Sequence, residues 1–236
     1  MKQASWQRLR RTAAGCLGGL ALVLGVVGVL LTYEPLFYRQ LVVSEGEDVE
    51  ALSRRAVTKA AAWHTSISRP GAWETALTTD EVNAWLAVDL PRNHPHWLPS
   101  GASQPRIGFL PQHVLLGARV GYGPLTAVAA MDFEVVLRDV NHLAIVLDQA
   151  HVGAIPLPRA PILRELSRRI SRLGMATDLR RLDGRLVLMV YIPSTHDAGA
   201  TSYWLESLAF GAGELLLSGE TRSTAANRPS PTPPPS

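Results

Sequence analysis

The histidines are the side chains of this sequence best suited to metal binding or proton transfer. His94 and His96 stand two residues apart, and His113 follows downstream. Two imidazoles at that spacing could bind one metal ion from an extended segment. Prolines surround the pair, however, and Asp89 is the only carboxylate close to it in sequence, so ordinary loop histidines are the favoured interpretation. We therefore predict no metal site and no cofactor. If the protein were an enzyme, these three histidines would be the first place to look.

Other arrangements typical of catalysis are absent from the sequence. It contains no G-x-S-x-G elbow, no H-E-x-x-H motif and no phosphate-binding glycine loop after a strand. His142, Asp148 and His151 share one predicted strand, but Asp148 and His151 point to opposite faces and do not form an acid–base pair. Asp132 and Glu134 lie on the polar side of another strand, where solvated charges belong. We predict no catalytic residue and no enzymatic activity.

Residues Ala13–Thr32 form an uncharged, apolar segment. Twenty helical residues span about 30 Å, the thickness of the hydrocarbon core of a bilayer. Basic residues precede the segment and mostly acidic residues follow it, which predicts a cytoplasmic N-terminus. Tyr33, Phe37 and Tyr38 could form the outer aromatic belt. The sequence thus predicts a single-pass membrane protein with an extracytoplasmic domain.

A cleaved signal peptide is the alternative interpretation of the N-terminal segment. Its charged start fits, but the apolar run is longer than a usual signal core, and no small-x-small cleavage site follows it. The single cysteine, Cys16, lies within the run, so an intrachain disulfide is excluded.

The net charge and the composition define the predicted domain organisation. The chain has 236 residues and a net charge of +3, and its first twelve residues carry +4, so the remainder is slightly acidic and predicts no nucleic-acid partner. The predicted segments are a cytoplasmic basic tip (1–12), a transmembrane helix (13–32), a juxtamembrane linker (33–43), an α+β domain (44–222) and a disordered Pro-rich tail (223–236).

Within that domain the hydrophobic pattern predicts helices and long strands. Two capping boxes, Ser44 with Glu47 and Thr78 with Glu81, predict two helix starts. Apolar residues alternate over 125–137, and the next predicted strand, 142–152, is apolar on both faces in its first half, which predicts a strand covered on both sides or lining an apolar cavity. Helical spacing predicts an amphipathic helix over 161–173. The segment 92–104 is rich in proline and histidine and predicts a loop. A hairpin over 203–221 closes the domain.

Two short motifs resemble a known family. An N-terminal anchor is followed by Thr-Asp-Glu-Val-Asn-Ala-Trp-Leu at 79–86, and Gly-Ala-Ile-Pro-Leu-Pro at 153–158 precedes the amphipathic helix. This pattern resembles the YpmS-like bacterial membrane-anchored proteins, which in turn resemble the tubular lipid-binding (TULIP) superfamily. The resemblance implies a strongly curved antiparallel sheet wrapped around an amphipathic helix, with an apolar groove for acyl chains. It implies no catalytic residues.

We therefore expect a module of the cell envelope that binds a lipid or another apolar ligand. The alternative is a structural or assembly subunit that docks a protein partner near the membrane. The residues expected to line a ligand groove are Met131, Phe133, Val135, Leu143, Ile145, Leu147, Leu166 and Ile170. The residues that could contact anionic headgroups are Arg164, Arg168, Arg169 and Arg172. The expected partners are membrane lipids and a protein of the envelope.

Overall fold

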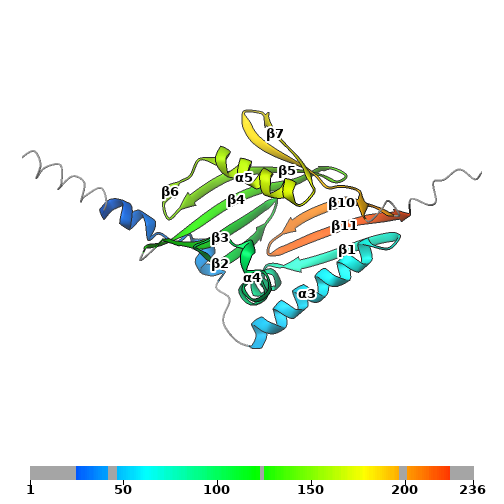
Figure 1. Ribbon diagram of the computed structural model, residues 1–236, viewed down its shortest axis with the longest axis horizontal. Coiled ribbons are helices and arrows are strands. Elements are labelled where there is room, and N and C mark those ends of the chain that lie inside the picture. Colours follow the sequence, from blue (N-terminus) through cyan, green and yellow to red (C-terminus); the bar gives the residue numbers. More distant parts are fainter. Residues whose placement is uncertain (1–24, 42–46, 123–124, 197–200, 224–236) are drawn as a thin grey trace, which may run out of the picture.

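The computed structural model describes residues 25–41, 47–122, 125–196 and 201–223, which form mostly antiparallel strands and fewer helices (Figure 1). The helices are α2 (Leu36–Gln40), α3 (Glu47–Ile67), α4 (Thr79–Asn93), the 3₁₀ turn η1 (Pro95–Trp97) and α5 (Arg159–Arg172). The strands belong to two sheets. The apolar face of a sheet must be buried, and here helices pack against the sheets and cover such faces.

The larger sheet has the strand order β2-β3-β4-β5-β8-β7, and β6 pairs with β5. Its strands are β2 (Ala102–Leu110), β3 (His113–Tyr122), β4 (Leu125–Asp139), β5 (His142–Val152), β6 (Ile155–Pro156), β7 (Ala176–Leu182) and β8 (Arg185–Tyr191). The register places Phe133 beside Leu147 and Leu116 beside Met131. Paired residues share a face of the sheet, so the period-two pattern of the sequence produces one apolar face.

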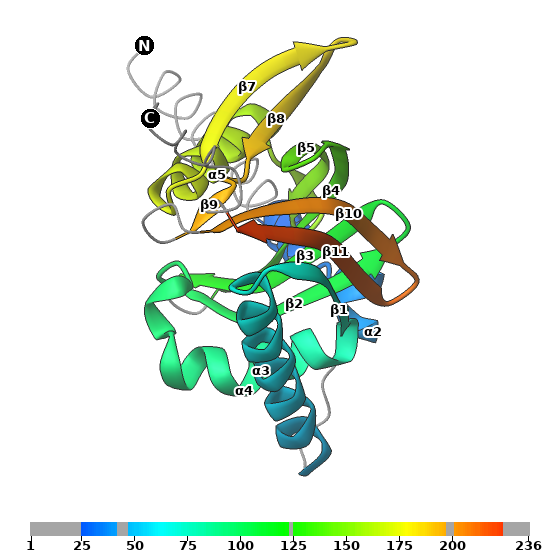
Figure 2. The same ribbon diagram turned by 90° about the vertical axis from the view of Figure 1, so that its right-hand side faces the viewer.

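The smaller sheet joins one strand from early in the chain to three from its end. Its order is β1-β11-β10-β9, with β1 (Gly71–Thr78), β9 (Thr195–His196), β10 (Thr201–Gly211) and β11 (Glu214–Ser223). The predicted closing hairpin is confirmed as β10 and β11. Figure 2 shows α3 running beside β1.

Asn141 connects the two sheets by hydrogen bonds. It occupies the turn between β4 and β5 with φ +59°, a conformation that asparagine tolerates better than most residues. Its main-chain N–H donates to the carbonyl of Leu205 at 3.2 Å, and its side-chain oxygen accepts from the Leu205 N–H at 2.6 Å. Its side-chain nitrogen donates to the carbonyl of Tyr203 at 3.0 Å. At another junction, the rings of Phe109 and Phe210 lie 5.9 Å apart.

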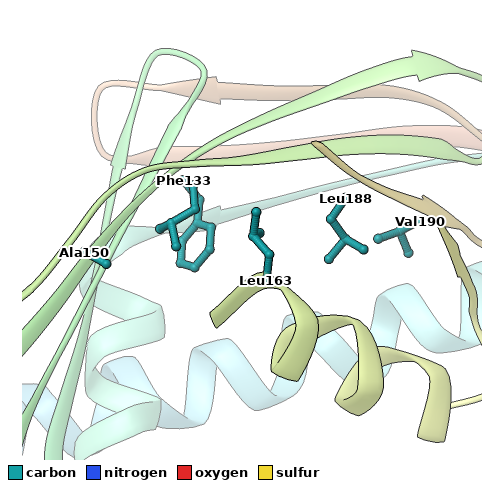
Figure 3. Close-up of a cluster of buried hydrophobic side chains, with 6 residues drawn as sticks. Phe133, Ala150, Leu163, Leu188 and Val190 are labelled. Atoms are coloured by element: carbon teal, nitrogen blue, oxygen red, sulfur yellow. The ribbon is translucent and has the colours of Figure 1, made fainter. Parts of the chain in front are cut away.

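Helix α5 covers one face of the larger sheet, and the main apolar cluster lies between them (Figure 3). Leu163 of α5 belongs to the same buried cluster as Phe133, Leu147 and Leu188, which are all 5 % exposed or less. The expected fold, a strongly curved sheet wrapped around an amphipathic helix, is wrong. The sheet is open, with β2 and β7 as its two ends, and α5 lies on its surface (Figure 1).

The expected transmembrane helix is also contradicted. Residues 13–24 lie outside the described residues, and residues 25–31 are helical, with Thr32 in the turn that follows. The carbonyl of Leu30 accepts a hydrogen bond from Ala154 N at 2.8 Å, so the end of this helix rests on the turn before β6. Among the described residues no helix is long and apolar enough to cross a bilayer. The predicted single-pass membrane localisation and the predicted transmembrane start of the fold are therefore wrong.

Residues 33–41 of the predicted juxtamembrane linker (33–43) pack against the folded domain, and its last two residues lie outside the described residues. Its helix α2 packs on the face of the larger sheet opposite α5, where Tyr38 is fully buried. A Cβ added at Gly117 of β3 would lie 2.6 Å from the Tyr38 ring, so glycine is required for this close approach. Glu34 adds an ion pair with Arg119 at 2.7 Å. Tyr38 therefore belongs to the core and not to an aromatic belt.

Most of the local sequence predictions are confirmed. The capping box of Thr78 and Glu81 starts α4, and the long alternating segments form β4 and β5. The predicted helices after Ser44 and before Leu173 are α3 and α5. The capping box at Ser44 and the predicted tail from residue 224 onward lie outside the described residues. The segment 92–104 is not entirely loop, because it contains η1 and the first residues of β2.

Candidate functional site

Helix α4 is fixed in place at its first turn. Thr78 Oγ1 accepts from Glu81 N at 3.2 Å, and Glu81 Oε2 accepts from Thr78 N at 3.0 Å. Lys59 of α3 reaches the same carboxylate at 2.8 Å, which ties the two helices together. Burial by itself raises the pKa of Glu81, but the hydrogen bonds from Lys59 and Thr78 outweigh it and lower the pKa. Glu81 is therefore a structural carboxylate that stays ionised at neutral pH.

One turn later, Asn83 joins α4 to the larger sheet. Its Nδ2 donates to the carbonyl of Ile107 at 2.8 Å, and its Oδ1 accepts from Ile107 N at 2.8 Å. Asn83 is 2 % exposed. Its amide thus replaces a neighbouring strand at the edge of β2 and holds α4 beside that strand.

Among the described residues, a solvent-open hollow of about 1020 Å³ lies between α3, α4, the 95–101 segment and the start of β2. Apolar side chains from all four elements supply much of its lining. Those residues are Val49, Leu86, Ala87, Val88, Pro91, Pro95, Leu98, Pro99, Ala102 and Pro105. Because Asn83 and the Thr78–Glu81 box fix α4, the wall formed by α4 is set by buried hydrogen bonds.

Two charged residues of the lining, Glu50 and Arg92, lie at the side of the hollow that the two helices form. Arg92 Nη2 of α4 lies 3.3 Å from Glu50 Oε1 of α3, and Arg54 lies 3.6 Å from the same carboxylate. These side chains are half or more exposed. Glu50, Val88 and Arg92 also line an adjoining hollow of about 330 Å³. The two residues of this ion pair therefore line both hollows.

The opposite wall is held by the N-terminal segment. The guanidinium group of Arg106 donates to the carbonyl of Tyr38 and lies 4.2 Å from the centroid of the Tyr38 ring. The Tyr38 hydroxyl donates to the carbonyl of Gln104 at 2.8 Å. Gln104 and Arg106 line the hollow, so α2 positions this wall from behind.

Aromatic rings order the segment that rims the hollow. His94 stacks on Trp97 at 4.4 Å between centroids, and Trp85 of α4 lies 6.1 Å from Trp97. His96, two residues from His94, lines the hollow. The two histidines considered for metal binding thus have different environments, one in a ring stack and one at the hollow.

His113, the third candidate, belongs to a charged cluster on β3, β4, β5 and β8. Its Nδ1 lies 2.8 Å from Asp132 Oδ1 and 3.9 Å from Asp148. Arg185 bridges Asp148 and Glu134. The hydrogen bond with Asp132 raises the pKa of His113 against the opposing effect of burial, and the nearby carboxylates add to the rise. In the part of the chain that the structure describes, no group of three or more His, Cys, Asp or Glu side chains is arranged to hold a metal ion.

The residues expected to line a ligand groove lie on α5 and on the sheet face that it covers, and none of them lines the hollow. Phe133 and Leu147 belong to the buried cluster shown in Figure 3. The other six, all partly buried, pack against it: Met131, Val135, Leu143, Ile145, Leu166 and Ile170. Their contacts are those of a core, and the entry of an acyl chain there stays a prediction.

The arginines of α5 lie on its outer side. Glu165 pairs with Arg168 at 3.0 Å and with Arg169 at 3.1 Å. Arg164 and Arg172 have no carboxylate within 4.0 Å among the described residues. The contact of these four arginines with anionic headgroups stays a prediction.

Sequence reasoning missed the hollow because its lining comes from distant segments. The one signal was the proline- and histidine-rich stretch 92–104, which supplies the rim. Comparison with protein-family models, with curated proteins and with solved structures found no match.

Proposed function

We propose that this protein is a non-enzymatic binding module that takes an apolar or amphipathic small molecule, such as an acyl chain with a polar head, in the hollow between α3, α4 and β2. The observation that carries the proposal is the hollow itself. Its volume of about 1020 Å³ is at the upper end of the range typical of small-molecule sites. Its lining combines many apolar side chains with a few charged ones, the composition that such sites share.

The arrangement suggests how the ligand lies. Leu86, Val88 and Leu98 offer an apolar wall for a hydrocarbon chain. Burial of that chain supplies roughly 0.8 kcal/mol per methylene. The Glu50–Arg92 pair, at the side of the helices, can exchange its partly exposed ion pair for hydrogen bonds to a polar head.

The absence of a reaction is part of the proposal. The histidines suited to proton transfer are stacked on Trp97, placed singly at the hollow, or paired with Asp132 elsewhere. A polar rim around an apolar wall is an arrangement for holding a ligand.

Native mass spectrometry of the delipidated full chain with dodecanoate, and titration with Nile red, test the proposal. We expect a one-to-one dodecanoate complex that competes with the dye. In the variant Ala87→Trp a large side chain enters the hollow from an exposed lining position, and we expect at least a tenfold weaker affinity. The matched control is Ala209→Trp, an exposed position on β10, which should leave the affinity unchanged.

Two results would overturn the proposal. One is a folded, delipidated protein that takes up neither probe. The other is equal binding by Ala87→Trp and the parent chain, which would place the ligand outside this hollow.

A further inference from the structure

The ends of the two sheets differ in what lies against them. At β2, Asn83 occupies the hydrogen-bonding groups of Ile107, and Pro105 has no N–H to offer. Helices α3 and α4 pack against β1, and β9 has only two residues. At the remaining end, β7 pairs with β8 on one side only. The β7–β8 hairpin projects beyond α5 (Figures 1 and 2).

The outer edge of β7 is a template for another strand. In an antiparallel pair every second residue points its N–H and C=O away from its partner. Within the described chain, no main-chain hydrogen bond joins β7 to any strand or loop other than β8. The outward groups of this seven-residue strand are therefore available to an incoming strand.

The two faces of β7 differ in charge. Thr177, Leu179 and Arg181 pair with Val190, Leu188 and Leu186, which face α5. On the other face Asp178 and Arg180 form an ion pair and balance each other. Arg185 also lies on that other face, where it pairs with Glu134 and Asp148. The arginine of the hairpin that no described carboxylate approaches within 4.0 Å, Arg181, thus lies on the face that carries α5.

Helix α5 adds arginines beside that face. Ser167 and Ser171 lie 2.7 Å and 2.8 Å from the hydroxyl of Thr177, which puts this side of the helix next to β7. Arg164 precedes Ser167, and Arg168 precedes Ser171, by three residues, so each arginine neighbours one of these serines on the exposed surface of the helix. Positions 159–185 hold eight arginines and three acidic residues, although the whole chain has a net charge of only +3.

We propose that the edge of β7 docks an extended, acidic segment of a partner protein as an additional strand of the larger sheet. The main-chain groups of β7 supply the hydrogen bonds. Arg164 and Arg181, which no described carboxylate approaches within 4.0 Å, attract the acidic side chains together with Arg168, which shares the single carboxylate of Glu165 with Arg169. Because these arginines lie on one face, the acidic residues of the partner occupy alternate positions. The site is separate from the hollow. It is the surface at which we place the protein partner of the alternative hypothesis, a subunit that docks another protein.

Other anionic partners fit less well. Lipid headgroups and nucleic acids would form ion pairs with the arginines, but they would not pair with the main-chain N–H and C=O groups at the edge of β7. A second copy of this chain would bring two arginine-rich edges together. A peptide strand uses both features, which is why the proposal commits to it.

A labelled seven-residue peptide of alternating Glu and Val, capped at both ends, is the probe. We expect fluorescence anisotropy to show binding to the full chain. The double variant R164E/R168E should weaken binding at least tenfold. The matched control R69E/R138E makes the same change of charge at two exposed positions away from β7 and should alter binding less than twofold. Circular dichroism must show that both variants are folded.

Peptides N-methylated at alternate residues test the strand pairing. One set of N–H groups faces β7 and the other faces away, so methylation of one set should weaken binding at least tenfold and methylation of the other should not. Equal binding by both methylated peptides would overturn the proposal, because charge alone would then explain the affinity. Tighter binding to single-stranded DNA or to phosphatidylserine vesicles, or a dimer formed through β7, would also overturn it.

Discussion

The side-chain amide of Asn83 makes both main-chain hydrogen bonds of Ile107, each at 2.8 Å. In a sheet those bonds would come from a neighbouring strand, but here they come from a helix. The contact closes the edge of β2 against further pairing and sets one wall of the hollow. A single buried side chain therefore contributes to the stability of the fold and to the shape of the candidate site.

Replacement of Asn83 by leucine should destabilise the protein by about 2–4 kcal/mol, because two buried main-chain groups of Ile107 lose their partners. Urea unfolding followed by circular dichroism measures the change. The matched control is Asn93→Ala, which removes an exposed hydrogen bond to Asp89 and should cost less than about 0.5 kcal/mol. Equal losses in the two variants would show that the Asn83–Ile107 contact has no special weight.

The variant Asn83→Asp separates the two hydrogen bonds. A carboxylate can accept from Ile107 N but cannot donate to the Ile107 carbonyl, whereas a protonated carboxyl can do both. This variant should therefore gain stability relative to the parent as the pH falls from 7 towards 4. A stability difference that is independent of pH would contradict the assigned roles of the two side-chain atoms.

The hydrogen bonds of α4 also show what could be predicted from sequence. Thr78 and Glu81 stand three residues apart, so their capping box is a local pattern and was predicted. Asn83 lies in the same segment, but its partner is 24 residues away, and nothing local distinguishes it from a solvated asparagine. Local patterns determine where a helix starts, whereas its long-range partners depend on the tertiary fold.

The same distinction explains two errors of the sequence-based prediction. The aromatic residues after the apolar N-terminal run resemble a membrane-interface belt, yet Tyr38 packs on Gly117 of β3 and bonds to Gln104, 66 residues away. Strand β7 was missed because its sequence, Ala-Thr-Asp-Leu-Arg-Arg-Leu, has only a weak apolar alternation. It forms a strand because the apolar β8 beside it needs a partner that covers its edge.

Glu81 should make the stability of the protein depend on acidic pH. The hydrogen bonds from Lys59 and Thr78 lower its pKa in the folded state against the effect of burial. Because the pKa of Glu81 is lower in the folded state, this residue stabilises the fold at pH values above its unfolded pKa, near 4.5. That stabilisation is lost as the pH falls through the folded pKa. Glu81→Gln should cost about 1–3 kcal/mol at pH 7 and flatten the acid limb of the stability curve. Unfolding by urea between pH 3 and 7 checks this. An unchanged acid limb would show that another carboxylate dominates.

The contribution of His113 to stability should depend on pH in the opposite direction to that of Glu81. Its hydrogen bond to Asp132 raises its folded pKa above 6.5, so its contribution is complete below the unfolded pKa and is lost as the pH rises through the folded value. The side chain is 35 % exposed, which limits the effect to less than about 1 kcal/mol. An NMR titration of the imidazole should show a raised pKa that falls in Asp132→Asn. A titration that is identical in the two proteins would contradict the assigned contact.

The packing of α2 on β3 should be intolerant of one added methyl group. A Cβ at position 117 would lie 2.6 Å from the Tyr38 ring, which is fully buried and cannot move aside without displacing α2. We expect Gly117→Ala to cost about 1–3 kcal/mol in thermal or urea unfolding, the usual range for overpacking. It should also speed proteolysis after Arg39, because α2 would leave the sheet more often. The matched control is Gly211→Ala, where the nearest atom would be 3.9 Å away and little change is expected. If both variants matched the parent in stability and in cleavage at Arg39, α2 would not be held on the sheet in solution, and the wall of the hollow that Tyr38 supports would not be fixed.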